Sequence, residues 1–120
     1  MAHIIPMEAD NIVGMRVKGK LSEEDFDRIV TVIDERLTRH EKLRIYVEME
    51  SFGGMSLETF FKDVKFGLKR YDRFDKKAIV TDQAWVQKVV PVVDKLFPNI
   101  EVKAFPFEEK ERAKEWVLAP

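Results

Sequence analysis

The sequence predicts an α/β fold with a mixed, mostly parallel five-stranded sheet and about four helices, in the order ββαβαβαβα. Two observations support this prediction. Segments with apolar residues at every second position alternate with segments in which apolar residues recur every three or four positions. Helices between strands return the chain across the sheet, so successive strands run parallel. A length of 120 residues fits one domain over residues 1–120.

The N-terminal part predicts an antiparallel hairpin. Segment 3–7 is short and contains Pro6, which cannot donate a hydrogen bond to a neighbouring strand, so we expect an edge strand there. Segment 11–19 alternates apolar and polar residues, as a half-buried strand does. The turn-forming residues 8–11 join the two strands.

Ser22 begins the first predicted helix. The run Ser22–Asp25 resembles a capping box, with acidic side chains at the positive end of the helix dipole. Apolar residues then recur on one stripe as far as Leu37. The next strand is expected at 43–49, and the glycine-containing loop 51–56 leads into the second helix.

The C-terminal half continues the alternation of strands and helices. The expected elements are a helix at 57–71, a short strand at 77–81, a helix at 85–97 that Pro91 breaks or kinks, a strand at 100–105 and a helix at 107–118.

Composition and charge exclude several classes of protein. The 21 Lys and Arg residues nearly balance the 22 Asp and Glu residues, so no overall field directs the chain to nucleic acid, and we expect no nucleic-acid partner. The absence of cysteine excludes disulfides, thiolate catalysis and cysteine metal sites. No apolar run approaches the ~18 residues that span a bilayer, and the N-terminus has no signal-peptide pattern. We therefore expect a soluble, cytoplasmic protein.

Motifs that carry catalytic chemistry are missing. His3 and His40 are far apart, and neither accompanies a carboxylate motif. Ser56 lies outside any nucleophile elbow, and no phosphate-binding glycine loop occurs. Glu48 and Glu50 share one strand face, but no neighbouring histidine or apolar shield suggests an acid–base pair. We expect no enzyme activity, no catalytic residue, no metal and no cofactor.

The helix at 85–97 is more apolar than packing against a sheet requires. Its apolar residues fill an arc of roughly 160° at 100° per residue, whereas a stripe of about 100° is sufficient. Deep burial, a bound ligand or lipid, and a second subunit compete to explain the surplus. A ligand held between this helix and the preceding one would contact Phe60, Phe61, Val64, Trp85, Val89, Val92 and Leu96.

The near-neutral total conceals two regions of opposite charge. Residues 62–77 contain seven basic and three acidic residues, a local charge of +4, whereas residues 20–50 contain six basic and nine acidic residues, a local charge of −3. A basic amphipathic helix with an extra aromatic residue suits an anionic membrane surface or an acidic partner; the alternative is a solvated charged face. The residues expected at this contact are Lys62, Lys65, Phe66, Lys69, Arg70, Arg73 and Phe74.

A family resemblance follows from the element order and from two stretches. These are the strand at 77–82 leading to Trp85, and the ending at 102–105 followed by Glu109, Ala113 and Trp116. The pattern covers nearly the whole chain and resembles the SpoIIAA-like family of small bacterial proteins. That family shares its fold with STAS domains, the class of the anti-sigma factor antagonist SpoIIAA.

The resemblance implies a STAS-like sandwich and a non-enzymatic binding or regulatory role. In anti-sigma antagonists a phosphorylatable serine sits at the start of the second helix, within an Asp-Ser-Ser-Gly type motif. Ser56 is in about that position, but the run Phe52–Leu57 lacks the flanking motif. The family is also similar to lipid-binding folds of the CRAL-TRIO type.

Two functional hypotheses result. In the first, the protein is a binding module that holds an apolar or lipid-like ligand between the helices at 56–71 and 85–97 and associates peripherally with the inner membrane face. In the second, it is a STAS-type protein-interaction regulator with Ser56 as a possible phosphosite. A homodimer that buries Trp85, Val92 and Leu96 competes for the same apolar surface.

Overall fold

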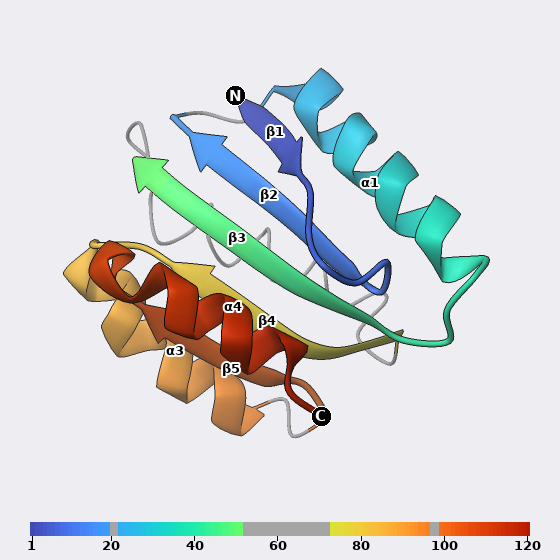
Figure 1. Ribbon diagram of the computed structural model, residues 1–120. Coiled ribbons are helices and arrows are strands. Elements are labelled where there is room, and N and C mark those ends of the chain that lie inside the picture. Colours follow the sequence, from blue (N-terminus) through green and yellow to red (C-terminus); the bar gives the residue numbers. More distant parts are fainter. Residues whose placement is uncertain (20–21, 52–72, 97–98) are drawn as a thin grey trace.

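The computed structural model describes residues 1–19, 22–51, 73–96 and 99–120, which form an α/β fold around a five-stranded sheet (Figure 1). The spatial order of the strands is the same as their order in the chain. β1 pairs with β2 antiparallel, and each later neighbouring pair is parallel, which confirms the predicted mixed sheet. The strands are β1 (Ala2–Ile5), β2 (Ile12–Lys18), β3 (Leu43–Ser51), β4 (Phe74–Val80) and β5 (Glu101–Phe105).

The described helices are α1 (Glu23–Leu37), α3 (Ala84–Leu96), the short 3-10 helix η2 (Phe107–Glu109) and α4 (Lys110–Leu118). The helix predicted at 57–71 lies outside the described residues. In the part of the chain that the structure covers, no helix has the length and apolar character needed to cross a bilayer.

The predicted capping box at the start of α1 is confirmed. The backbone N–H of Asp25 donates to Ser22 Oγ at 3.1 Å, and the Ser22 N–H donates to Asp25 Oδ2 at 3.1 Å. Two of the N–H groups that a helix end leaves without partners are satisfied in this way. These bonds, led by the one from the Ser22 backbone, hold the pKa of the Asp25 carboxyl well below its usual value.

α3 continues through Pro91, so of the two outcomes predicted there, a break or a kink, the break does not occur. Proline removes one backbone donor, which costs one helical hydrogen bond. Val86 and Val90 are 0% and 1% exposed and pack into the core beneath the helix. We attribute the continuity of α3 to this packing, which opposes the local loss.

β4 begins at Phe74, three residues earlier than the predicted strand, and this corrects one expectation about the surface. Phe74 pairs with Leu43 in the β3–β4 ladder and is 7% exposed in the main core. Its predicted role as a membrane or acidic-partner contact is therefore wrong. The charged residues Asp75, Lys76 and Lys77 that follow Phe74 interrupt the apolar pattern of a buried strand, although Lys76 is itself buried and 7% exposed.

The sheet separates two cores. α1 and α3 cover one face, where the larger apolar cluster includes Val13, Ile33, Ile45, Ile79 and Val90. α4 covers part of the other face, where a smaller cluster includes Ile12, Tyr46, Ala78, Phe105 and Val117. β1 and β5 are the two edge strands of the sheet, and β5 lies between α3 and α4 (Figure 1).

Candidate binding groove along the edge of the sheet

Most residues of the predicted apolar ligand site lie outside the described part of the structure. Val92 is the member of that set with a described side chain, and it is 57% exposed on α3. The remaining members are Phe60, Phe61 and Val64, which lie outside the described residues, and Trp85, Val89 and Leu96, whose side chains are likewise outside the described part. The predicted site therefore stays a prediction.

The predicted basic contact surface and the possible phosphosite Ser56 also lie largely outside the described residues, as do Lys62, Lys65, Phe66, Lys69 and Arg70. Arg73 is described and has an internal role. Its Nε donates to the Glu41 carbonyl at 2.6 Å, and its Nη2 donates to the carbonyls of Leu37 at 3.1 Å and His40 at 3.2 Å. The guanidinium thus stabilises the negative end of the α1 dipole.

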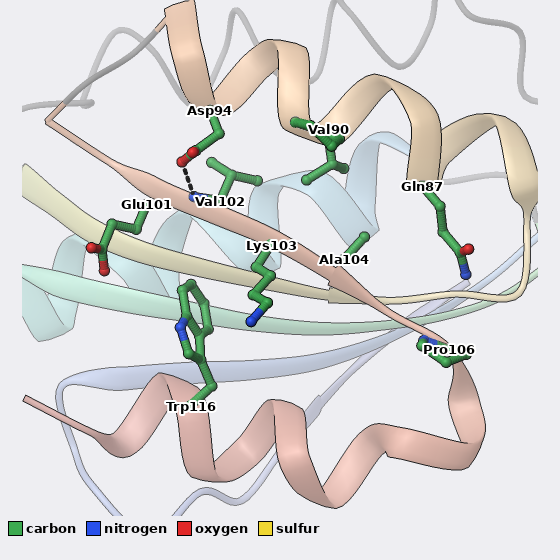
Figure 2. A pocket seen from close by; sticks show the side chains of 10 residues that line it. Gln87, Val90, Asp94, Glu101, Val102, Lys103, Ala104, Pro106 and Trp116 are labelled. Atoms are coloured by element: carbon green, nitrogen blue, oxygen red, sulfur yellow. Dashed lines mark hydrogen bonds between the residues drawn. The ribbon is translucent and has the colours of Figure 1, made fainter.

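An open groove of about 580 Å³ runs along β5, between α3 and α4 (Figure 2). This volume lies within the range of ligand pockets, roughly 300–1,000 Å³. The groove combines apolar and polar side chains from three elements. Its lining includes Gln87, Val90, Pro91 and Asp94 from α3, Val102, Lys103 and Ala104 from β5, and Trp116 from α4.

The backbone of β5 faces this groove with every second residue. The Thr81 N–H donates to the Phe105 carbonyl at 2.9 Å, so Phe105 directs its backbone groups toward β4. Because backbone groups alternate in direction along a strand, Val102 and Ala104 direct theirs away from β4, toward the groove. Within the described ranges, one of these outward groups has a partner: the Val102 N–H donates to Asp94 Oδ1 at 2.9 Å (Figure 2).

The polar residues of the groove that come from α3 are engaged within the fold. Asp94 is half-buried and caps Val102, while Gln87 Nε2 donates to the Thr81 carbonyl at 3.0 Å. Glu101 and Lys103 are exposed on β5, two residues apart and therefore on one face of the strand. Lys103 Nζ lies 5.3 Å from the centre of the Phe105 ring.

Trp116 forms the wall of the groove on the α4 side (Figure 2). Its ring centre lies 6.0 Å from that of Phe105 and 4.9 Å from Lys76 Nζ. Lys76 also donates to the carbonyls of Trp116 at 3.0 Å and Ala119 at 2.8 Å, at the C-terminal end of α4. Arg44 donates from Nη1 to the Val117 carbonyl at 2.8 Å. These two cations anchor α4 and hold the tryptophan at the groove.

A second polar cluster lies under the α4 side of the sheet and serves structure rather than the groove. Glu48 is 2% exposed, and it accepts from Tyr46 Oη at 2.9 Å and from Arg16 Nε at 3.2 Å. Burial, followed by the bond to Glu48, raises the pKa of the Tyr46 phenol well above its usual value. Arg16 also approaches the exposed Glu50 at 3.7 Å. Glu48 and Glu50 are thus bridged by one arginine.

His40 has a partner that sequence spacing did not indicate. Its Nε2 lies 2.7 Å from Asp10 Oδ2, and Arg39 Nε donates to the same oxygen at 3.0 Å. The bonds from Arg39 and then His40 lower the pKa of the Asp10 carboxyl to about 2. Across the described ranges, no cluster of three or more His, Asp or Glu side chains is arranged to hold a metal ion.

Three comparisons with known proteins place this geometry in context. The SpoIIAA-like sequence profile matches residues 12–118. A crystal structure of an uncharacterized protein of the DUF3478 family from Shewanella loihica PV-4, described as having a SpoIIAA-like fold, superposes with a TM-score of 0.70. The two chains are 24% identical, and the match covers 98% of this chain and 92% of that one. A comparison with curated proteins finds no match.

Proposed function

The chain belongs to the SpoIIAA-like family, and on that premise we propose that it is a non-enzymatic interaction module that binds an extended polypeptide segment along the edge of β5. The fold, which it shares with the Shewanella protein, does not by itself assign a function. The proposal rests on the groove at this edge.

One observation carries the proposal: the edge of β5 that faces away from β4, which no strand of the described ranges pairs with, forms the floor of a groove. The outward N–H of Val102 donates to Asp94 Oδ1, and the other outward backbone groups of Val102 and Ala104 lie at the spacing of a sheet ladder. An added strand gains affinity from main-chain hydrogen bonds and specificity from side-chain pockets on either side. Here Val90 and Pro91 border one side and Trp116 borders the other.

The chemistry of the groove favours binding over catalysis. Asp94 and Gln87 hold backbone groups of the fold, so neither is placed to transfer a proton to a substrate. Glu101 and Lys103 are solvated side chains on one strand face, suited to pairing with opposite charges on a partner. A partner strand with alternating charge is therefore favoured.

The test is selection of short random peptides displayed on phage against the Trp85→Phe variant, followed by fluorescence titration of the synthetic hits. The chain has two tryptophans, so this variant leaves Trp116 in the groove as the reporter. Ala104→Pro removes the outward N–H and leaves the β4 ladder intact, because that N–H points away from β4. We expect binding to weaken about tenfold in this variant, which corresponds to one hydrogen bond of about 1.4 kcal/mol.

Ala104→Ser is the matched control, since it keeps the backbone N–H and adds little volume. It should bind like the parent protein. Peptides that bind Ala104→Pro as tightly as the parent would place the interaction elsewhere and contradict the proposal. Circular dichroism must show that both variants fold.

A second candidate function is the binding of an apolar or lipid-like ligand with peripheral membrane association. The observation that favours it is Val92, a large apolar side chain that is 57% exposed on α3. The local charge of +4 over residues 62–77 adds electrostatic attraction to anionic lipid. Of the three described basic residues in that stretch, Arg73 and Lys76 are bonded within the fold and Lys77 also has a partner. The attraction therefore depends on Lys62, Lys65, Lys69 and Arg70.

Flotation with vesicles of phosphatidylcholine, with and without phosphatidylserine, tests this second candidate. Binding should require the anionic lipid and should weaken in Lys69→Ala/Arg70→Ala, while Lys42→Ala, in the acidic region, leaves it unchanged. Mass spectrometry of organic extracts of the purified protein should find a co-purifying lipid. Equal absence of binding to both vesicles would exclude the membrane contact.

A further inference from the structure

We infer that the strand which occupies the β5 edge is β5 of a second copy of this chain, paired antiparallel across a twofold axis at Val102. The inference rests on the proposed strand addition and names its partner. It concerns a different surface from a dimer that would bury Trp85, Val92 and Leu96.

The sequence of the edge is self-complementary when it is reversed. From 100 to 104 it reads Ile-Glu-Val-Lys-Ala. An antiparallel partner centred on Val102 places Glu101 opposite the second copy's Lys103, and Lys103 opposite its Glu101. Apolar residues then meet apolar residues at the other three positions. Opposite charges that face each other across strands stabilise the pairing.

Charge also excludes the neighbouring registers. A shift by two residues in one direction places Lys103 opposite Lys103, and a shift in the other direction places Glu101 opposite Glu101. Like charges directly opposite each other are destabilising. An odd shift would pair residues whose side chains point to opposite faces of the sheet. Among these registers, the one centred on Val102 satisfies both conditions.

Backbone geometry agrees with this register. Val102 and Ala104 direct their N–H and carbonyl groups outward, so the two copies of Val102 would form a hydrogen-bonded pair. Glu101 and Lys103 then form pairs that are not hydrogen-bonded to the second copy. In such pairs the facing Cα atoms are closer, and the side chains interact more strongly. The result is one continuous sheet across two copies, with an isologous interface.

Asp94 competes with the second copy for the same donor. In the single chain its Oδ1 accepts the Val102 N–H at 2.9 Å, which covers part of the edge. Pairing transfers this N–H to the carbonyl of the partner's strand, so Asp94 must move away in both copies. Asp94 therefore opposes dimerisation, as devices that protect edge strands do.

Sedimentation equilibrium of the full chain tests the inference through charge reversal. We expect the wild type to form dimers, and Lys103→Glu and Glu101→Lys each to weaken them about tenfold or more, since each variant creates two like-charge pairs. An equimolar mixture of the two variants restores only opposite-charge pairs, so it should form heterodimers at least as tight as the wild-type dimer. Asp94→Ala should tighten the dimer about tenfold by removing the competing acceptor.

The outcomes separate this inference from the proposed function. A wild type that stays monomeric up to its solubility limit, or a dimer unchanged by both charge reversals, overturns the inference. If Ala104→Pro still weakens peptide binding about tenfold in that case, the β5 edge binds other chains and the proposed function stands. If Asp94→Ala weakens or fails to change the dimer, the competition between Asp94 and the partner is wrong.

Discussion

The face of the sheet under α1 and α3 and the face under α4 are packed in different ways. Beneath α1 and α3, the larger apolar cluster includes Ile29, Phe74, Ile79 and Val90. Beneath α4, the apolar cluster is smaller, and the buried side chains of Glu48 and Lys76 lie beside it. α4 has 9 residues, against 15 in α1. A short helix offers little apolar area, so directed bonds supplement burial on its side.

The two faces should therefore respond to different kinds of substitution. On the face under α1 and α3, the free energy of unfolding should fall most when a substitution removes buried side-chain volume. On the face under α4, it should fall most when a substitution removes a hydrogen-bond partner.

Phe74→Ala should lower the free energy of unfolding by about 3–5 kcal/mol, because it removes a buried aromatic side chain from the apolar face. Urea denaturation followed by circular dichroism measures the change. Val92→Ala, at an exposed position, serves as the control and should change stability by about 0.5 kcal/mol or less. A decrease in the free energy of unfolding of less than about 1 kcal/mol for Phe74→Ala would be typical of an exposed residue and would contradict the burial of Phe74.

Tyr46→Phe should cost about 1–3 kcal/mol, since it leaves Glu48 Oε2 buried without its donor. The double variant Tyr46→Phe/Glu48→Met replaces both partners with apolar groups and should be more stable than the single variant. A double variant less stable than the single one would show that Glu48 matters mainly through Arg16. In the wild type, the absorbance change that accompanies ionisation of the Tyr46 phenol should occur at a pH well above the usual pKa of tyrosine.

Lys76→Met should cost about 1–2 kcal/mol and loosen the C-terminal end of α4, because it removes two bonds to helix carbonyls. Hydrogen exchange should accelerate in Lys110–Leu118 and stay unchanged in α1. Uniform acceleration across both helices would instead indicate global destabilisation.

The smallest effect concerns the exposed ion pair of Asp10 with Arg39 and His40. The folded pKa of Asp10, about 2, lies below its ordinary value of 3.8. The pair therefore contributes stability above pH 4, and this contribution is lost as the pH falls through 2. Carboxyl NMR titration should give a midpoint near 2 in the wild type and a higher one in Arg39→Ala. An unchanged midpoint in that variant would assign the shift to another group.

Local patterns identified the described strands and helices, but not the contacts that join distant segments. Alternation marked β2 and β5, and the Ser22 capping box marked the start of α1. Lys76 belongs to the basic stretch 62–77, and its burial was not predicted because its carbonyl partners lie 40 and 43 residues away in the chain. The same limit hid the buried environment of Glu48, which Arg16 approaches from another strand.

The groove was beyond local reasoning for a related reason. Periodicity shows that 100–105 is a strand but not that it lies at an edge, since strand order depends on how helices cross the sheet. In the sequence, nothing distinguishes Asp94 from the other polar residues of the helix predicted at 85–97. Its capping of Val102 becomes visible when α3 and β5 are placed together.

The agreement between strand order and chain order also bears on how the molecule assembles. Each described strand joins the sheet beside the strand that precedes it in the chain, so none has to enter between two strands already paired. Short separations between paired segments reduce the entropy lost in closing each loop, which favours rapid folding. We expect assembly by successive addition, in which the edge of the growing sheet passes from β2 to β5. In the folded molecule, β5 is the last strand of the described sheet, so its edge away from β4 is the place where the successive addition of strands ends.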